Sequence, residues 1–368
     1  MPQHKNLALI MAGGTGGHIF PGLAVASELT ARGWQVEWLG SVGGMEEKII
    51  NQQEIPLHLI QVKGLRGKGL MGWFKAPFSL TKAIYQAVQV IKKQKPNIII
   101  GFGGFAAGPG GIAAFLARVP LVIHEQNAIA GMTNRILAKF SQRVFQGFPD
   151  AFLAKHKVIT VGNPVRKEIK AIRTNGELTP IQDKRLKILI VGGSRGALAL
   201  NRCVPKILAE LINQKVVIVK HQVGAERVNE TLQFYQQANI HEPGYFELFE
   251  FIDDMAAALY WADLVICRAG ASTVAEVAVA GKCAIFIPFP YAVDDHQTAN
   301  ANWLVNHQAA MCISESELMN DESVYRITQL IENPEKIQQM ASKAKQIAYT
   351  SAAEQMADYC DKLKVKAA

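Results

Sequence analysis

Two glycine-rich loops carry the residue pattern best suited to chemistry in this chain. An apolar run at 6–11 leads into Gly-Gly-Thr-Gly-Gly-His at 13–18, and a second apolar run at 187–191 leads into Gly-Gly-Ser-Arg-Gly at 192–196. A glycine turn between a strand and a helix points backbone N–H groups at an anion, and the helix N-terminus adds partial positive charge. The repeat predicts two Rossmann-like halves and a substrate that carries phosphate.

A third glycine-rich run, residues 101–111, also follows an apolar segment and precedes a helical pattern. Open α/β sheets bind ligands at the carboxyl ends of their strands, so three such loops would line one crevice. The alternative is that the glycines only let helices pack closely on the sheet. The glycines alone leave both interpretations open.

The loops do not match the usual nucleotide-binding fingerprints. Residues 13–17 do not read G-x-G-x-x-G, and the expected second strand, 35–39, ends in Gly40-Ser41 with no acidic residue to hold a ribose. The chain also lacks the G-x-x-x-x-G-K-[ST] loop of triphosphate-binding proteins. A dinucleotide-dependent oxidoreductase is therefore a minor alternative, which a titration with NAD(P)H would test.

The elements that must position these loops alternate between strands and helices, which predicts a parallel α/β sheet in each half. Strands are expected at 6–11, 35–39, 97–101, 120–123 and 143–145, then at 187–191, 215–220, 245–249, 264–267 and 284–287. Helices are expected at 18–31, 44–53, 79–94, 108–117 and 130–139, then at 196–212, 225–237, 254–260, 272–280 and 295–306.

The boundary between the halves is expected near Gly162, where a crossing strand ends in a Gly-Asn-Pro turn. The polar stretch that follows, 167–185, shows little periodicity. We expect one domain over 1–162 and a second over 163–339. The tail reads as one or two helices, and a helix at about 340–368 is expected to pack back on the first domain.

The composition limits the classes of protein to which this chain can belong. With 368 residues, 49% hydrophobic and 19% charged, the chain is globular and suits two domains. Five cysteines without a C-x-x-C pair argue against a metal or disulfide framework and favour a reducing cytoplasm. No secretory signal is expected, and no apolar stretch is long enough to span a bilayer. The net charge of +8 favours anionic partners.

The motifs taken together resemble the MurG family of glycosyltransferases, from about residue 6 to beyond residue 300. The segments that carry the resemblance are GGTGGH at 13–18, GFGGFAAGPGG at 101–111, HEQN at 124–127, GNPVR at 162–166, GGSRGA at 192–197, FIDDM at 251–255, CRAGASTVAEVAVAG at 267–281 and DDHQTAN at 294–300. No single motif is decisive, whereas the ordered set is specific.

The resemblance implies the GT-B fold, with two Rossmann-like domains facing a deep cleft. It implies an inverting hexosyltransferase that moves N-acetylglucosamine from UDP-GlcNAc to lipid I, the undecaprenyl-pyrophosphate-linked N-acetylmuramoyl-pentapeptide. The product would be lipid II, with a new β-1,4 bond. Such an activity implies a place in peptidoglycan synthesis, and with it in cell shape and cell division.

For the donor, the resemblance places the nucleotide on the second domain. The implied donor contacts are Arg166, Ser194, Ile252, Ala271, Ser272, Thr273, Val274, Ala275, Glu276 and Gln297. Ser272 or Thr273 is expected to cap a helix, which would put Glu276 in its first turn, near the ribose hydroxyls. The alternative role for Glu276 is to complement the helix dipole. His296 stands where the family commonly has a second glutamine, which leaves the local sugar contact uncertain.

For the leaving diphosphate, the resemblance implies Ser194 as a contact, and Arg166 at the domain crossing could clamp a phosphate with two hydrogen bonds. The chain contains no D-x-D triad, the metal-binding motif of the other large glycosyltransferase fold. We therefore expect helix dipoles, backbone N–H groups and Arg166 to stabilise the leaving group. No essential metal and no cofactor are expected.

For the acceptor, inverting transfer needs a base to take the proton of the attacking hydroxyl. The resemblance implies His18 as the leading candidate, and its expected place at the start of a helix disfavours imidazolium, which keeps the ring neutral and able to accept a proton. The alternatives are that His18 only orients a phosphate or a loop, and that Glu125 or His124 is the base. The remaining implied acceptor or sugar contacts are Thr15, Gly16, Gly17 and Asn127.

Residues 65–78 mix bulky apolar side chains with cations, as a peripheral membrane anchor does. The expected membrane contacts are Leu65, Arg66, Lys68, Leu70, Trp73, Phe74, Lys75 and Phe78. The alternative is a buried loop with solvated lysines. Expected partners are UDP-GlcNAc, lipid I, an anionic membrane surface and other cell-wall or division proteins, but no nucleic acid. The expected location is the cytoplasmic face of the bacterial inner membrane.

Two other functions remain open from the sequence. One is a GT-B transferase with a different lipid acceptor, such as diacylglycerol, which product analysis would separate. The other is a non-catalytic subunit that binds nucleotide or recruits a membrane partner, which would keep full function after His18→Ala and Glu276→Gln.

Overall fold

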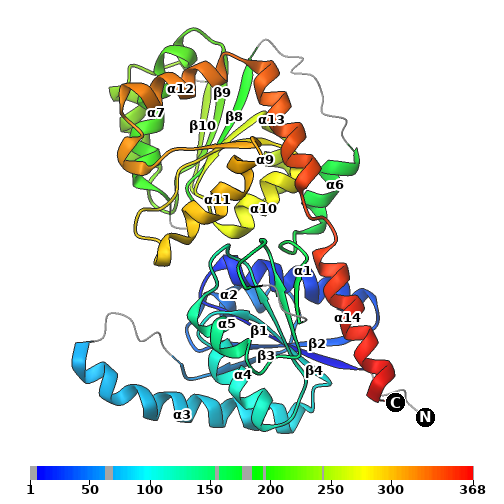
Figure 1. The fold of residues 1–368 in the computed structure, drawn as a ribbon. Coiled ribbons are helices and arrows are strands. Elements are labelled where there is room, and N and C mark those ends of the chain that lie inside the picture. The colour runs from blue at the N-terminus through cyan, green and yellow to red at the C-terminus, as the bar shows by residue number, and fades with distance from the viewer. Residues whose placement is uncertain are drawn as a thin grey trace. The chain divides into compact units, whose positions relative to one another are not determined.

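The protein is described by a computed structural model over residues 6–62, 69–153, 157–175, 185–193, 196–242 and 244–367. The side chains of residues 69–76, 173–175, 293 and 364–367 lie outside this description. The chain divides into two compact units (Figure 1). The first holds residues up to Arg166 together with the chain from Thr350 onward, and the second is Lys167–Tyr349.

Within the described residues, the first unit is a parallel sheet of seven strands in the order β3-β2-β1-β4-β5-β6-β7. Its strands are β1 (Leu7–Ala12), β2 (Gln35–Ser41), β3 (Leu57–Ile60), β4 (Ile98–Gly103), β5 (Leu121–Glu125), β6 (Arg143–Gln146) and β7 (Val158–Thr160). Its helices are α1 (Gly16–Ala31), α2 (Met45–Ile50), α3 (Gly69–Gln94), α4 (Ala107–Leu116), α5 (Met132–Leu137) and α14 (Ala352–Ala367).

The central strand β1 shows why this sheet is covered on both faces. All six of its residues are buried, as expected of a strand inside a parallel sheet with helices on both sides. Ala8 and Ile10 belong to the core that α1 and α14 cover, whereas Leu9 and Met11 belong to the core that α3 and α4 cover. The alternation follows from the two-residue period of a strand.

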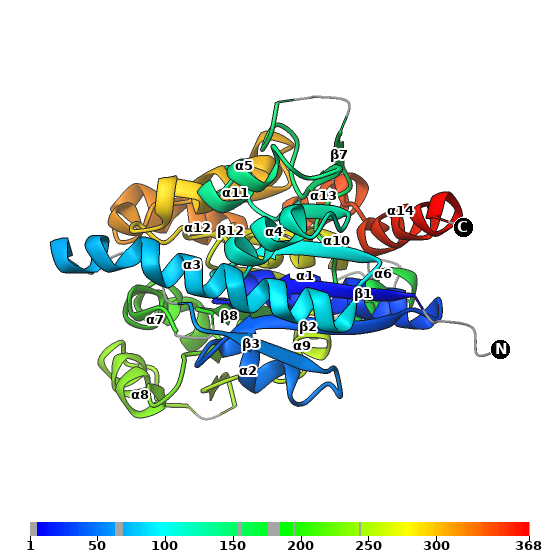
Figure 2. The ribbon, with the colours of Figure 1, turned by 90° about the horizontal axis from the view of Figure 1, so that it is seen from below.

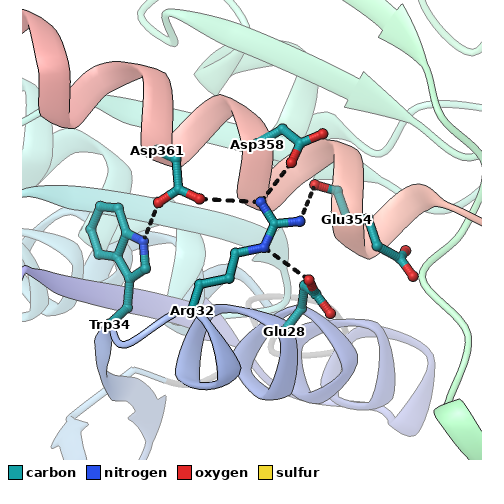
Figure 3. Close-up of polar contacts among 6 residues, drawn as sticks. All are labelled: Glu28, Arg32, Trp34, Glu354, Asp358 and Asp361. Carbon is teal, nitrogen blue, oxygen red and sulfur yellow. Dashed lines mark hydrogen bonds and ion pairs between the residues drawn. The ribbon is translucent and has the colours of Figure 1, made fainter.

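The last helix, α14, is held on α1 by an arginine near the end of that helix (Figure 3). Arg32 donates to Asp358 at 2.6 Å, to Asp361 at 3.1 Å and to the carbonyl of Glu354 at 3.4 Å. Trp34 donates its indole N–H to the second oxygen of Asp361 at 2.9 Å. These charge-assisted bonds raise the pKa of Arg32 above its usual value and fix the last helix on the first unit.

Within the described residues, the second unit is a parallel sheet of six strands in the order β10-β9-β8-β11-β12-β13. Its strands are β8 (Leu186–Val191), β9 (Val217–Gln222), β10 (Phe246–Phe249), β11 (Leu264–Cys267), β12 (Cys283–Phe286) and β13 (Ala310–Cys312). Its helices are α6 (Lys167–Asn175), α7 (Leu198–Asn213), α8 (Val228–Gln237), α9 (Met255–Trp261), α10 (Ala271–Ala280), η1 (Val293–Asp295), α11 (His296–Asn306), η2 (Glu315–Glu317), α12 (Asp321–Ile331) and α13 (Pro334–Ile347).

Two parallel α/β sheets confirm the expected fold class. Two strands and two α-helices were not expected, β3, β13, α6 and α12, and neither were the short 3-10 helices η1 and η2. The two strands have only four and three residues, too short for a clear alternation. Helix α6 packs against α9 and α10, so tertiary contacts rather than its own pattern stabilise it.

Helix α3 begins at Gly69, earlier than the expected start at Ser79, and runs through Pro77. A proline removes only one backbone donor, so an exposed helix can continue past it. In Figures 1 and 2 the N-terminal part of α3 projects past the first sheet. None of the helices in the described residues is long and apolar enough to cross a membrane.

Candidate active site

The first glycine loop, between β1 and α1, closes around a buried carboxylate. Glu46 of α2 is 0% exposed and accepts hydrogen bonds from the backbone N–H of Gly14 at 3.0 Å and of Ser41 at 2.8 Å. The Ser41 hydroxyl donates to the same carboxylate at 2.6 Å. A Cβ at Gly13 would lie 2.3 Å from the Glu46 carboxylate. The loop therefore contains an internal anion.

Taken together, hydrogen bonds affect the pKa of Glu46 more than burial does. Burial alone raises the pKa of this carboxyl, but the bonds from Ser41 and Gly14 hold its pKa below the usual value. The sequence interpretation missed Glu46, because it looked for an acidic residue at the end of the second strand. The available signal was the glutamate pair Glu46-Glu47, which follows Gly43-Gly44 after one methionine, at the start of a helix.

The third glycine loop, between β4 and α4, packs directly on the first. A Cβ at Gly104 would lie 2.2 Å from the backbone oxygen of Gly13, and Gly104 has φ +85°. A Cβ at Gly103, with φ +102°, would lie 3.1 Å from the ring of His18. These two glycines are required for close backbone approach, and they place the β4 loop against the candidate base.

His18 lies in the first turn of α1, half-buried, with Thr15 as the N-cap residue of that helix. Its ring Nδ1 is 3.0 Å from the amide oxygen of Gln126, which follows β5. No described residue forms a hydrogen bond with the other ring nitrogen. Thr15 is exposed, and Gly16 and Gly17 form the helix start beside it. The structure thus gathers these four expected residues in one turn of helix.

The two rival bases are occupied by structural hydrogen bonds. Glu125 is 2% exposed, and its two oxygens accept from the backbone N–H groups of Asn127 and Gly131 at 3.0 and 3.1 Å. It also accepts from the side chains of Asn127 and Asn134 at 3.2 and 2.8 Å. His124 is 0% exposed and lies 2.9 Å from the carbonyl of Gly162. Both side chains brace the loop after β5.

Arg166 lies at the end of the first unit, half-buried, with its guanidinium 5.3 Å from the ring centroid of Phe20. Phe20 is one turn beyond Gly16, and its ring lies 3.0 Å from where a Cβ at Gly16 would stand. The structure therefore brings Arg166 to the α1 end of the first glycine loop.

In the second unit, α10 begins one residue earlier than expected. Gly270 is the N-cap residue, with an extended backbone, so Ser272 and Thr273 lie inside the first turn and Glu276 lies past it. The expected cap at Ser272 or Thr273 was wrong, because the carbonyl of Gly270 already accepts the first helical hydrogen bond, from Val274 at 2.9 Å. Ala271, Val274 and Ala275, by contrast, are buried.

Gln222, at the end of β9, joins two segments that were expected to contact the nucleotide. Its amide nitrogen donates to the carbonyl of Gly193 in the second glycine loop at 3.1 Å. Its amide oxygen accepts from the backbone N–H of Ile252 at 3.2 Å. Gln222 is 2% exposed and was missed, since a lone glutamine at a strand end carries no sequence signal. Ser194 lies outside the described residues.

Gln297, in the first turn of α11, joins two further segments. Its amide oxygen accepts from the backbone N–H groups of Ala269 at 3.2 Å and Phe289 at 2.9 Å. Its amide nitrogen makes no hydrogen bond to a described residue. Arg268 supports the same region by donating to the carbonyls of Ile287 and Pro288, both at 3.1 Å.

Most of the expected membrane contacts lie outside the described residues and side chains. Leu65, Arg66 and Lys68 lie outside the described residues, and Leu70, Trp73, Phe74 and Lys75 belong to the part of α3 whose side chains are not described. Phe78 is described, and it is 82% exposed. Among the described residues, no group of histidine, cysteine, aspartate or glutamate side chains could hold a metal ion.

Comparisons with known proteins cover nearly the whole chain. Residues 8–146 match the Glycosyltransferase family 28 N-terminal domain, and residues 187–356 match the C-terminal domain of the same family. A protein of Chromohalobacter salexigens named UDP-N-acetylglucosamine--N-acetylmuramyl-(pentapeptide) pyrophosphoryl-undecaprenol N-acetylglucosamine transferase is 47% identical over 353 residues, which are 96% of this chain and 95% of the relative.

A protein of Pseudomonas putida with the same name is 46% identical over 358 residues, 97% of this chain and 98% of the relative. Among solved structures, the crystal structure of MurG from Acinetobacter baumannii has a TM-score of 0.79 and 40% sequence identity. That similarity covers 97% of this chain and 99% of the other.

Proposed function

The chain belongs to glycosyltransferase family 28, and from this premise we propose that it transfers N-acetylglucosamine from UDP-GlcNAc to lipid I with inversion, forming the β-1,4 bond of lipid II. The observation that carries the proposal is identity of 47% over 96% of the chain with a transferase of that name. As a glycosyltransferase, the protein must activate an acceptor hydroxyl and stabilise a leaving diphosphate.

In this proposal the first unit binds the acceptor and His18 is the base. His18 is supported by its position in the first turn of α1, by its half-exposed ring and by the absence of any hydrogen bond from a described residue to its Nε2. Glu125 is less suited, because four N–H donors already occupy its buried carboxylate. Thr15, Gly16, Gly17 and Asn127 would contact the acceptor phosphate or a sugar.

The second unit binds UDP-GlcNAc in this proposal. Ile252 would border the uracil, Glu276 would accept from the ribose hydroxyls, and the amide nitrogen of Gln297 would donate to the sugar. The other proposed contacts are Ser194 on the diphosphate and the start of α10 at Ala271, Ser272, Thr273, Val274 and Ala275. Arg166 would neutralise phosphate charge, and no metal would be required.

We also infer that α3 places the protein on an anionic membrane surface at the cytoplasmic face of the inner membrane, where lipid I is embedded. Phe78 is 82% exposed, and Tyr85 on the same helix is 64% exposed. Exposed aromatic side chains beside lysines are typical of interfacial helices. Co-sedimentation with vesicles should be strong for anionic lipid and weak for zwitterionic lipid, and equal weak binding to both would contradict it.

The transfer itself is tested with the purified protein, UDP-GlcNAc and a soluble lipid I analogue, with product identified by mass. The expected result is one added N-acetylglucosamine, at the same rate with and without a metal chelator. His18→Gln should lower kcat by about 10²–10⁴-fold, the usual contribution of a general base. No transfer to lipid I, with transfer to diacylglycerol, would instead identify a glycolipid synthase.

A further inference from the structure

We propose that His124 and Gln126 are positioning residues that hold His18 as the tautomer with a proton on Nδ1 and a lone pair on Nε2. The four groups form a chain of hydrogen bonds from the Gly162 carbonyl through His124 and Gln126 to His18. The inference rests on the proposed function in which His18 is the base, and it explains how the ring is kept ready to accept a proton.

The direction of the chain is set at its buried end. The carbonyl of Gly162 can only accept, so Nε2 of His124, 2.9 Å away, must carry a proton. His124 is 0% exposed, and burial lowers its pKa to about 4, so the ring is neutral at physiological pH. A neutral imidazole has one N–H only, which leaves Nδ1 of His124 as an acceptor.

The amide of Gln126 donates a hydrogen bond on the His124 side and accepts one on the His18 side. Its nitrogen lies 3.2 Å from Nδ1 of His124 and 3.2 Å from the backbone oxygen of the same residue, and both of these atoms require a donor. The amide oxygen of Gln126 is therefore the atom that faces His18, at 3.0 Å from Nδ1. Because an amide oxygen only accepts, Nδ1 of His18 must be the protonated nitrogen.

The opposite orientation of the Gln126 amide conflicts with its surroundings. An amide oxygen on the His124 side would face the lone pair of a backbone carbonyl at 3.2 Å. It would also require a proton on Nδ1 of His124 in addition to the proton on Nε2, which would place a cation in a fully buried position. One orientation alone satisfies every group in the network.

Neighbouring groups keep the network in place. Asn163 donates its side-chain N–H to the backbone oxygen of Gln126 at 3.0 Å, and the ring of Phe102 packs 5.6 Å from that of His124. Gly103 leaves just enough room for the His18 ring. The orienting group is thus a neutral amide that cannot take the proton from His18, and the acceptor proton stays on the imidazole.

In the proposed transfer step, one bond forms and one bond breaks at the anomeric carbon. The acceptor oxygen forms a bond to the anomeric carbon as its proton passes to Nε2 of His18. The bond from the anomeric carbon to the diphosphate breaks, and its electron pair leaves on the diphosphate oxygen. His18 becomes an imidazolium, with Nδ1–H still donating to Gln126. With the opposite tautomer, Nε2 would carry a proton and could not accept another.

Nitrogen-15 NMR of protein labelled at histidine tests the proposal without reference to activity. The chain has nine histidines, so the His18 signals are assigned by their loss in His18→Gln. At a pH well above the usual histidine pKa, we expect a protonated Nδ1 and an unprotonated Nε2. A protonated Nε2 in the wild-type protein would overturn the proposal.

Two substitutions at one position separate orientation from packing. Gln126→Met removes the acceptor at similar volume, so His18 should populate both tautomers, and kcat should fall by about tenfold or more with little change in KM. Gln126→Glu keeps an oxygen opposite Nδ1 of His18, so it should retain the tautomer, while the loss of the donor to the backbone oxygen of His124 should lower the stability of the protein. Gln146→Met removes another buried amide of the same sheet and should leave both the tautomer and kcat unchanged.

The outcomes distinguish this inference from the function on which it rests. An unchanged His18 tautomer in Gln126→Met would overturn the positioning role. A changed tautomer with an unchanged kcat would support the positioning role and exclude His18 as the base. A similar loss of kcat in Gln146→Met would assign the effect to general destabilisation and overturn the link to His18.

Discussion

The glycine loop after β1 and the glycine loop after β8 share a strand–loop–helix plan but differ in what lies inside them. In the first loop the Gly14 N–H donates to the buried carboxylate of Glu46. In the described part of the second loop no carboxylate accepts from Gly193, and a Cβ at Gly193 would meet nothing within 4 Å. The first loop is filled from within, and the second is open beside Gly193.

The difference separates two uses of one motif. A strand–glycine–helix turn favours an anion in either unit, but Glu46 already supplies a negative charge to the first loop. The Gly14 end of that loop is therefore occupied, which leaves its α1 end, at Thr15, Gly16 and Gly17, as the part proposed to contact the acceptor beside His18. The proposed donor diphosphate would be such an external anion for the second loop, where a Cβ at Gly193 meets nothing within 4 Å.

The largest expected effect comes from alanine at matched glycines. Gly104 and Gly193 both have φ +85°, but a Cβ would lie 2.2 Å from backbone at Gly104 and in open space at Gly193. Both substitutions add the strain of a left-handed backbone, about 1–2 kcal/mol. Gly104→Ala adds a clash of about 1–3 kcal/mol or more.

Hydrogen exchange of the backbone amides measures the loss of stability separately in each unit. Gly104→Ala should speed exchange in β1 and β4 strongly, and Gly193→Ala should speed exchange in β8 and β9 less, by the backbone strain alone. Equal loss of protection in the two units would contradict the view that only the first loop is closed.

The second expected effect concerns the internal anion. Glu46→Gln should lower the free energy of unfolding at neutral pH by about 2–3 kcal/mol, because a buried charged acceptor with three donors is replaced by a neutral amide. The folded pKa of Glu46 lies below its usual value. Its ionised form therefore adds stability above the unfolded pKa, and this is lost as pH falls through the folded pKa.

Unfolding of the wild type and of Glu46→Gln across the acid range tests this pH dependence. The difference between their free energies of unfolding should become smaller as the pH falls. The matched control is Glu47→Gln, whose carboxylate also accepts a backbone N–H, from Gly43 at 2.9 Å, but is only partly buried. If the difference in free energy of unfolding stays constant with pH, the shape of the Glu46 side chain and not its charge explains its role.

The smallest expected effect is in the open loop. Gln222→Leu removes the bonds to Gly193 and to Ile252, so the nucleotide site should be less well ordered. We expect KM for UDP-GlcNAc to rise by about tenfold, equivalent to ~1.4 kcal/mol, with a small change in kcat. Gln214→Leu, at an exposed position in the same unit, is the control. An unchanged KM would show that the hydrogen bonds of Gln222 are not needed to order the second loop.

Much of the fold was predictable from local pattern. Apolar runs such as the one at β1 and glycines at the strand ends placed both sheets, because a buried parallel strand must be apolar on both faces. The short strands β3 and β13 and the helix α6 were not predictable, since their stability comes from neighbours. The site residues His18 and Gln297 came from the family motifs, and their roles remain proposals.

The amino-acid sequence alone was enough to identify the class of protein, through two α/β units, three glycine loops and the ordered motifs of a glycosyltransferase family. Which groups meet in the site depends on the folded chain. Gln126 lies 108 positions from His18, and Glu46 lies 32 positions from Gly14, so neither contact has a local signal. Hydrogen-bond direction depends on which donor faces which acceptor, and only the folded chain brings those atoms together.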